Sequence, residues 1–274
     1  MKNVLTIAGS DSCGGAGIQA DLKTFSANGV YGMSVITAVT AQNTKGVFAV
    51  QDMDESIIKA QIDAIFTDIK VSAVKIGMVS KISTIEAISE KLKQYKPSPV
   101  VLDPVMISKS GFSLLKPESK TALIKDLIPL ATIITPNIPE AEEILKEISW
   151  DIKNIDTIEQ MELAAKEIYK LGCSNVLLKG GHLENDATDV LYDGENITYF
   201  RSNRINTKNT HGTGCTLSSA IASQLALGLN IIDAVKKAKE YITVAIEHSL
   251  DIGHGVGPTN HFYTLYKRAG MLNE

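Results

Sequence analysis

Short apolar runs alternate with amphipathic stretches along almost the whole chain. Runs rich in β-branched residues predict buried strands, and apolar residues recurring every three or four positions predict helices. The predicted strands are Val4–Ala8, Ser34–Ala41, Ala73–Ile76, Val100–Leu102, Thr132–Thr135 and Asn175–Lys179. Most of these strands are near-continuous apolar runs, which is typical of a parallel sheet with helices on both faces.

The helical patterns fall between and after these strands. The predicted helices are Ala16–Asn28, Glu55–Thr67, Ser83–Tyr95, Pro117–Asp126, Pro139–Glu147, Ile158–Leu171, Gly214–Leu227 and Ile231–Ser249. We also expect a hairpin of Val190–Tyr192 and Ile197–Arg201 around an Asp-Gly turn. The alternation of strands and helices predicts one doubly wound α/β domain over residues 1–274, because no repeat or linker divides the chain.

Composition and charge narrow the classes of function. The chain is 44% hydrophobic and 21% charged, as in ordinary globular proteins, and its net charge of −4 argues against a nucleic-acid-binding face. No apolar run approaches the roughly 20 residues that span a bilayer, and no cleavable signal is recognised, so we expect a cytoplasmic protein without a membrane partner. Three well-separated cysteines favour neither a disulfide framework nor a zinc site.

The segment 207–216, Thr-Lys-Asn-Thr-His-Gly-Thr-Gly-Cys-Thr, carries the strongest chemical signal. It precedes an amphipathic helix, and free backbone N–H groups at a helix start, together with the helix dipole, favour an anion. Gly212 and Gly214 would let a phosphate approach the backbone closely. The same dipole predicts a lowered thiol pKa for Cys215. A helix cap with a buried cysteine is the structural alternative.

Further polar clusters follow the predicted strands, at the edge of the sheet where α/β proteins bind ligands. Asp103 and Glu140 could hold Mg²⁺ through waters, or could simply be a loop cap and a helix-start acid. Lys179 could neutralise charge on a transferring phosphate, or lie in a surface turn. Asp21 could point toward a ligand from the first turn of its helix, or be a solvated first-turn acid.

The glycine-rich segment 8–17 does not fit the common nucleotide fingerprints. Its spacing is Gly-Gly-x-Gly rather than G-x-G-x-x-G, and no G-x-x-x-x-G-K-[ST] occurs in the chain. An NAD-dependent oxidoreductase is therefore disfavoured, and P-loop NTPases are excluded. His182 and His211 are possible acid/base groups, although a lone histidine is more often a hydrogen-bonded loop residue.

Taken together, these segments resemble the ribokinase-like superfamily, and within it the hydroxymethylpyrimidine/phosphomethylpyrimidine kinases of thiamine biosynthesis. The segments that carry the resemblance are 5–11 (LTIAGSD), 14–25 (GGAGIQADLKTF), 41–44 (AQNT), 75–78 (KIGM), 134–137 (ITPN), 179–182 (KGGH) and 208–216 (KNTHGTGCT). They occur in order over almost the whole chain.

The resemblance implies a ribokinase-like three-layer α/β/α fold with a central, mostly parallel sheet. It implies a homodimeric kinase that uses ATP and Mg²⁺ to phosphorylate 4-amino-5-hydroxymethyl-2-methylpyrimidine and then the monophosphate. The residues that it assigns to the pyrimidine are Gly9, Asp21, Gln42, Met78 and Val105. Those that it assigns to ATP, magnesium and the developing charge are Asn137, Lys179, Asp103, Glu140, Gly212, Thr213, Gly214 and Cys215.

Cys215 stands where ribokinase relatives generally have an aspartate base. A thiolate can accept a hydroxyl proton, so we expect Cys215 to serve the first transfer, whereas the second transfer starts from an ionised phosphate. Two alternatives stay open. A pyridoxal kinase of the same cysteine-bearing branch has a similar hydroxymethyl heteroaromatic substrate, and a non-catalytic pyrimidine-binding protein could share the fold.

Overall fold

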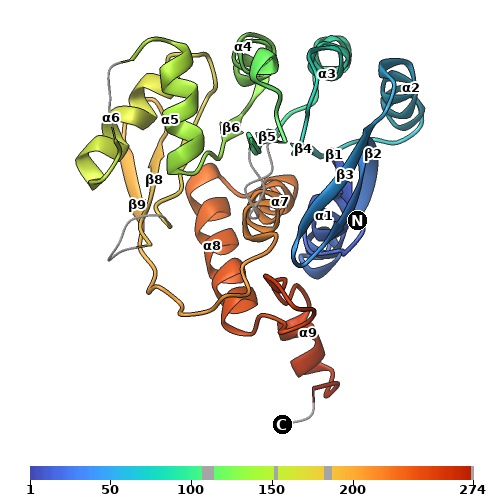
Figure 1. Cartoon of the computed structure of the whole chain (residues 1–274), viewed down its shortest axis with the longest axis vertical. Coiled ribbons are helices and arrows are strands. Elements are labelled where there is room, and N and C mark those ends of the chain that lie inside the picture. Colours follow the sequence, from blue (N-terminus) through green and yellow to red (C-terminus); the bar gives the residue numbers. More distant parts are fainter. Residues whose placement is uncertain (107–113, 151–153, 182–186, 273–274) are drawn as a thin grey trace.

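A computed structural model describes residues 1–106, 114–150, 154–181 and 187–272. Within these residues nine strands form one sheet in the order β3-β2-β1-β4-β5-β6-β7-β8-β9 (Figure 1). The strands are β1 (Asn3–Asp11), β2 (Tyr31–Asn43), β3 (Gly46–Asp52), β4 (Ala73–Ile76), β5 (Val100–Leu102), β6 (Ile133–Ile134), β7 (Val176–Leu178), β8 (Asp189–Tyr192) and β9 (Ile197–Phe200).

The six central strands, from β2 to β7, run parallel, and antiparallel strands flank them on both sides. From β1 the chain passes to β2 on one side, and then returns to β4 on the other side of β1. The connections therefore reverse direction between β1 and β4. Such a reversal opens a crevice at the carboxyl ends of the strands, where ligands bind in this class of fold.

Helices cover both faces of the sheet and complete a three-layer arrangement (Figure 1). On one face lie α1 (Gly17–Ala27), α7 (Thr213–Ala226) and α8 (Ile231–Glu247). On the other face lie α2 (Glu55–Phe66), α3 (Ile82–Tyr95), α4 (Lys120–Ala122), α5 (Ile138–Glu147) and α6 (Ile158–Tyr169). The short helix α9 (Tyr263–Arg268) extends away from the sheet near the C-terminus.

Two hydrophobic cores hold these layers together. In β5, Val100 and Leu102 pack into the core beneath α2–α6, whereas Val101 between them packs into the core beneath α7 and α8. None of the three is more than 2% exposed. Because successive side chains of a strand point to opposite faces, a strand covered on both sides must be apolar throughout. The continuous apolar runs of the sequence have this origin.

The predicted fold class is confirmed, and most predicted elements agree with the structure to within a few residues. Three differences occur. The segment 46–52, for which no strand was predicted, forms the antiparallel edge strand β3, and 263–268 forms α9. The single helix predicted over Pro117–Asp126 is instead a succession of 3₁₀, α and π turns: Pro117–Ser119, Lys120–Ala122, Leu123–Leu127 and Ile128–Leu130.

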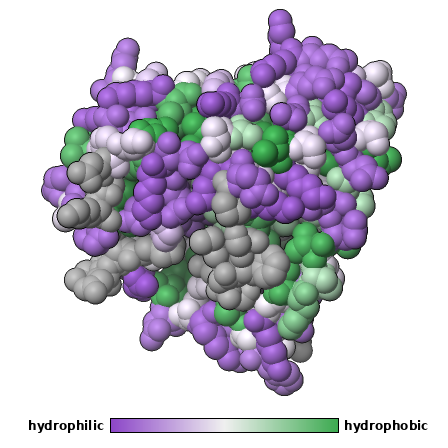
Figure 2. Space-filling model, turned by 45° about the horizontal axis from the view of Figure 1, so that its top comes forward, coloured by the Kyte–Doolittle hydropathy of each residue, from purple (hydrophilic) through white to green (hydrophobic). Residues whose placement is uncertain are grey.

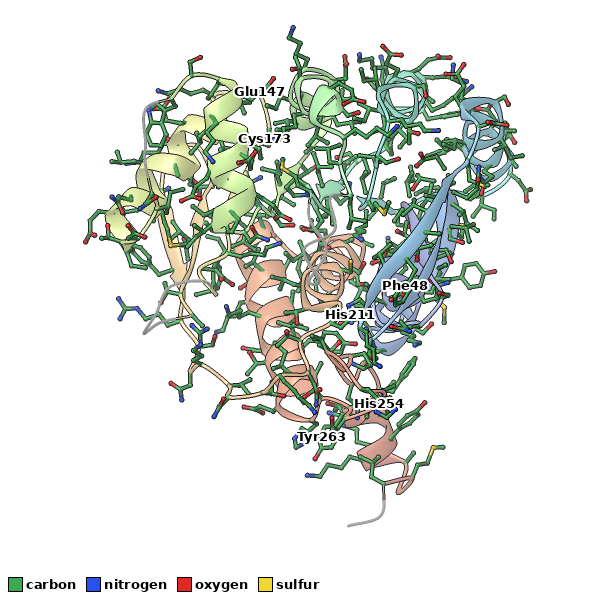
Figure 3. The ribbon with its side chains drawn as sticks, viewed as in Figure 1. Phe48, Glu147, Cys173, His211, His254 and Tyr263 are labelled. Carbon is green, nitrogen blue, oxygen red and sulfur yellow. The ribbon has the colours of Figure 1, made fainter. Side chains whose placement is uncertain are left out.

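The outer surface mixes polar residues with scattered exposed apolar side chains. Figure 2 shows a mostly hydrophilic face with smaller apolar patches between the polar residues. Phe48 of β3 points outward from the edge of the sheet, with 67% of its surface exposed (Figure 3). Among the helices of the described residues, none is both long and apolar enough to cross a membrane.

Candidate active site

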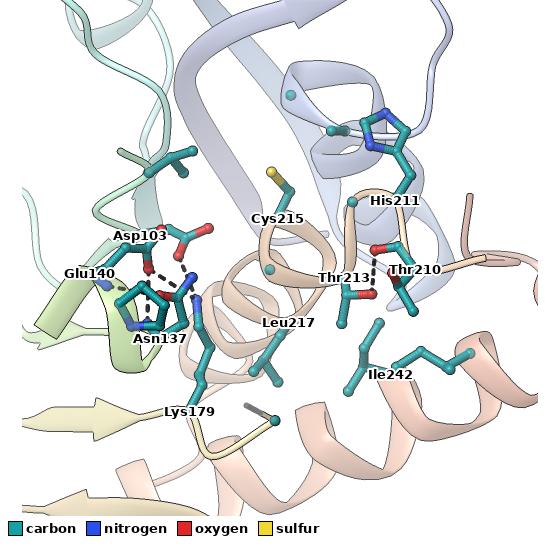
Figure 4. Close-up of a pocket in the computed structure, with 18 of the residues that line it drawn as sticks. Asp103, Asn137, Glu140, Lys179, Thr210, His211, Thr213, Cys215, Leu217 and Ile242 are labelled. Carbon is teal, nitrogen blue, oxygen red and sulfur yellow. Dashed lines mark hydrogen bonds and ion pairs between the residues drawn. The ribbon is translucent and has the colours of Figure 1, made fainter. Parts of the chain in front are cut away.

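A cavity of about 980 Å³ opens at the carboxyl ends of the parallel strands (Figure 4). The N-terminus of α7 separates its two sides, with His211 and Thr210 on one side and Asp103, Glu140 and Lys179 on the other. The predicted site residues that line it are Gly9, Gln42, Met78, Asp103, Val105, Asn137, Glu140, Lys179, Gly212, Thr213, Gly214 and Cys215. Residues from strand ends far apart in sequence therefore meet at one site.

The start of α7 is held in place by a close backbone contact. Gly212 caps the helix with a φ of 80°, and a Cβ at this position would lie 1.7 Å from the carbonyl oxygen of Gly15. Only glycine fits such a conformation and approach. The first intrahelical bond runs from the Thr216 N–H to the Gly212 carbonyl over 2.9 Å. The N–H groups of Gly214 and Cys215 precede it and have no intrahelical acceptor, so they are available to an anion.

Cys215 lies at this helix start, partly exposed, and lines the cavity. The prediction that the helix dipole lowers its pKa is wrong. Burial raises the pKa of the Cys215 thiol to about 11, although the nearby Lys75 ammonium opposes that rise. Removing an anion from water costs more here than the Lys75 ammonium and the Gly17 N–H return, and the Asp21 and Asp103 carboxylates add to the rise. The protein alone therefore keeps Cys215 as a thiol at neutral pH.

Lys179 connects the two carboxylates on the other side of the cavity. Its Nζ lies 3.0 Å from Asp103 Oδ1 and 3.9 Å from Glu140 Oε2. Burial would lower the pKa of Lys179, but the two carboxylates raise it above its usual value. For Glu140, burial outweighs the attraction of Lys179 and raises the pKa to about 7. A cation that approached this group would favour the ionised carboxylate.

A capping box at the start of α5 orients Glu140. Its Oε2 accepts from the Asn137 N–H at 2.8 Å, and Asn137 Oδ1 accepts from the Glu140 N–H at 2.9 Å. This reciprocal arrangement satisfies two helix-start donors. It also fixes the carboxylate against the cavity, so the helix-cap role and the ligand role that the sequence left as alternatives are compatible in one residue.

Asp21 does not line the cavity, and its predicted contact with the pyrimidine is not what the structure supports. The carboxylate is fully buried and lies 2.9 Å from Lys75 Nζ, an ion pair with no exposed atoms. It also accepts hydrogen bonds of 2.6 Å from the hydroxyls of Thr6 and Ser219. The Asp21 carboxylate therefore connects α1 to β1, β4 and α7, and these bonds give it a structural role rather than a ligand-binding one.

Lys75 is a cavity residue that sequence reasoning missed. It lies within the apolar strand β4, is fully buried, and reaches the cavity beside Gly77. Burial alone would lower its pKa, but Asp21 raises it above the usual value. A buried lysine almost always has a partner of opposite charge. The occurrence of a lysine within the short run Ala-Val-Lys-Ile could therefore have indicated a buried ion pair from the sequence alone. His182, another predicted acid/base group, lies outside the described residues.

His211 also contributes, but through contacts with the protein. Its Nε2 lies 2.8 Å from Asp11 Oδ2 and 3.4 Å from Gln42 Nε2. Gly15 leaves room for the ring, because a Cβ there would lie 2.2 Å from His211 Cδ2. In Figure 4 the ring lies apart from Cys215. The interpretation of His211 as a hydrogen-bonded loop residue therefore fits the geometry.

Comparison with known proteins identifies the family. The family model described as phosphomethylpyrimidine kinase matches residues 11–260. The chain belongs to the phosphomethylpyrimidine kinase family. A hydroxymethylpyrimidine/phosphomethylpyrimidine kinase of Rhizobium meliloti (strain 1021) is 51% identical over 96% of this chain and 98% of its own length. The predicted family and the assignment of the chain as a kinase enzyme are thereby confirmed.

Two solved structures extend the comparison with this family. The phosphomethylpyrimidine kinase of Clostridium difficile 630 is 57% identical and superposes with a TM-score of 0.79, covering 90% of this chain and all of that one. The pyridoxal kinase of Bacillus subtilis, solved as an ADP complex, is 42% identical with a TM-score of 0.89, covering 97% and 99%. The fold is thus shared by kinases named for two different substrates.

The Asp21–Lys75 pair predicts a stability effect rather than a binding effect. Because Asp21→Ala leaves a buried ammonium without its partner, we expect the free energy of unfolding to fall by about 3–5 kcal/mol. Urea denaturation measures this loss. The exposed Asp68→Ala is the matched control and should unfold at nearly the wild-type urea concentration. An Asp21→Ala enzyme that unfolds like wild type but binds the pyrimidine weakly would contradict the structural role.

Proposed function

We propose that this chain phosphorylates the hydroxymethyl group of 4-amino-5-hydroxymethyl-2-methylpyrimidine and then its monophosphate, with ATP as the phosphate donor, in thiamine biosynthesis. The observation that carries the proposal is the position of the α7 N-terminus, where Cys215 lies in the cavity between His211 and Lys179. Gln42 lines the same cavity beside His211. An anion-binding helix start between a ring-binding side and a charged side is what a phosphoryl transfer needs.

The ring-binding side combines a flat apolar contact with a polar amide. Met78 and Val105 offer the apolar surface, and Gln42 offers both a donor and an acceptor. Gly9 makes room for Met78, since a Cβ there would lie 3.0 Å from Met78 Sδ. These groups suit an aminopyrimidine, whose edge carries ring nitrogens and an exocyclic amine.

The nucleotide side is built around Lys179 and Asn137, with the apolar side chains of Leu217 and Ile242 farther along the cavity. In the first transfer the substrate hydroxyl oxygen forms a bond to the γ-phosphorus, and the bond from that phosphorus to the bridging oxygen breaks to release ADP. Cys215 as thiolate takes the hydroxyl proton. The N–H groups of Gly214 and Cys215 stabilise the charge on the transferring phosphoryl group, and Thr213 holds the turn through its bond to Thr210.

Asp103 and Glu140 fit a magnesium ion. Both carboxylates face the cavity beside Lys179, and Asp103 Oδ2 lies 3.4 Å from the Ser218 hydroxyl, its one hydrogen-bond contact among the described residues. Mg²⁺ prefers oxygen ligands, takes one or two carboxylates and keeps several waters. When bound there, the ion would neutralise phosphate charge. The ion also favours the ionised form of Glu140.

The domain organisation, the oligomeric state and the cellular compartment remain predictions. We infer that residues 1–274 act as one kinase unit, that two copies form a homodimer, and that the protein works in the cytoplasm. Pyridoxal phosphorylation is the second candidate function. It is supported by the 42% identity to a pyridoxal kinase of nearly the same length.

The substrate choice is tested by offering both candidates to the same enzyme. With ATP and Mg²⁺, we expect the aminopyrimidine to yield monophosphate and then diphosphate, separated by ion-exchange chromatography. Pyridoxal should react more slowly, because its ring lacks the amine that Gln42 can accept from. EDTA should stop both reactions. Pyridoxal phosphate as the main product would support the second candidate instead.

Replacing Cys215 should separate the two transfers. Cys215→Ala removes the proton acceptor, so we expect the alcohol step to slow by about 10²–10⁴-fold. The phosphate step, which starts from an ionised oxygen, should change far less. Single-turnover assays with each substrate measure the two rates. The buried Cys173→Ala, which lies outside the cavity, is the matched control. Equal losses in both steps would rule out this role.

The raised pKa of Cys215 predicts a pH dependence. The active form is the thiolate, whose fraction rises about tenfold per pH unit below a pKa of about 11. We therefore expect kcat/KM for the alcohol step to increase steadily from about pH 7.5 to about pH 9.5, whereas the phosphate step lacks this increase. A profile for the alcohol step that stays flat over this range would exclude the thiolate as its base.

A further inference from the structure

Gln42 reaches the cavity between two polar groups of the protein. Its Nε2 lies 3.4 Å from His211 Nε2, and its Oε1 lies 3.2 Å from the Thr40 hydroxyl. The oxygen and nitrogen of an amide occupy nearly the same positions after a half-turn of the group. Which atom faces which neighbour is therefore decided by the hydrogens that the neighbours can offer.

His211 offers no acceptor on this side. Its Nε2 lies 2.8 Å from Asp11 Oδ2, and the Asp11 carboxylate also accepts from the N–H groups of Gly15 and Ala16. Burial would raise the pKa of Asp11, but His211 and the backbone donors hold it below its usual value. An ionised carboxylate only accepts, so the hydrogen of this bond belongs to His211 Nε2, which then has no lone pair. Gln42, at 3.4 Å, faces this N–H and can share its hydrogen only as a weak second branch.

Thr40 can offer only an acceptor. Its hydroxyl lies 2.8 Å from the Ser10 carbonyl oxygen, which has no hydrogen to give. The single hydroxyl hydrogen is therefore used on Ser10, and the oxygen is left with lone pairs toward Gln42. An amide nitrogen facing His211 would place two donors together, and an amide oxygen facing Thr40 would place two acceptors together. A half-turn of the amide gives the Thr40 oxygen a donor and turns the amide oxygen toward the His211 N–H, so both unfavourable contacts are removed.

We propose that Asp11, through His211, and Ser10, through Thr40, fix the Gln42 amide with its oxygen toward His211 and its nitrogen toward Thr40. Asp11 and His211 are thus positioning residues for substrate choice. The inference rests on the proposed aminopyrimidine substrate and adds what orients the group that recognises it. The two chains of hydrogen bonds connect Gln42 to β1 and to the loop before α7, which both border the cavity.

An amide held in this way presents a fixed pattern to a ligand. One N–H and one lone pair of the oxygen remain after the bonds to Thr40 and His211. The N–H can donate to a ring nitrogen while the lone pair accepts from an adjacent exocyclic amine, as when a glutamine recognises the edge of adenine. A pyrimidine without the amine leaves the remaining lone pair of the Gln42 oxygen without a donor, which reduces its kcat/KM. If the amide could turn freely, this discrimination would weaken.

The test compares two substitutions of His211. The readout is the ratio of kcat/KM for 4-amino-5-hydroxymethyl-2-methylpyrimidine to kcat/KM for the analogue without the 4-amino group. His211→Leu removes the donor, so we expect this ratio to fall roughly tenfold, chiefly through KM for the aminopyrimidine. The KM for ATP should change less than about twofold. In His211→Gln the amide N–H can replace the Nε2–H, and the ratio should stay within about threefold of wild type.

Thr40→Val is the second variant, because it removes the hydroxyl oxygen that accepts from Gln42 and leaves His211 in place. We expect a similar fall in the ratio. In a Gln42→Leu background, His211→Leu should cause no further fall, whereas a general structural role would lower activity in either background. A ratio unchanged in both His211→Leu and Thr40→Val overturns this inference alone. A wild-type enzyme that phosphorylates neither pyrimidine overturns the proposed function as well.

Discussion

The buried ion pair between Asp21 and Lys75 is the constraint on which the rest of the site depends. It joins α1 to β4, and the hydroxyls of Thr6 and Ser219 extend it to β1 and α7. Neither charge is exposed, so neither can leave its partner without a large desolvation cost. Ser219 lies in the second turn of α7, so the pair holds this helix against the two strands between which the chain reverses direction. Together with the contact between Gly212 and Gly15, it sets the location of the anion-binding helix start.

The sequence predicted the centre of the sheet far better than its borders. Strand β5 is apolar on both faces, and that pattern has few structural interpretations. The edge strand β3 also contains a short apolar run, Val47–Val50, but none of its residues is buried and Phe48 is exposed. Helix α9 spans six residues and has no buried residue, so its sequence shows no periodic apolar face from which a helix could be predicted. Burial on two sides, rather than strand propensity, makes a strand recognisable from sequence.

The candidate site shows a different limit. Residues that follow parallel strands, such as Asp103 and Lys179, could be grouped from sequence because the fold brings all strand ends to one edge. Asp21 could not be placed correctly, since its partner lies 54 positions away and looks like an ordinary lysine. The pKa of Cys215 was misjudged for a related reason. A helix start is visible in sequence, whereas the burial that raises the pKa of Cys215 depends on the whole fold.

Glu140 illustrates how one position can be restricted by two independent demands. Its side chain closes the capping box with Asn137 and also turns a carboxylate toward Asp103 and Lys179. Glutamine would keep the cap but lose the charge, and aspartate would keep the charge but fall short of the cap. Few substitutions can meet both demands. We therefore expect fewer substitutions to be tolerated at position 140 than either the helix or the charge cluster would allow by itself, and directed evolution of the enzyme would gain little by varying it.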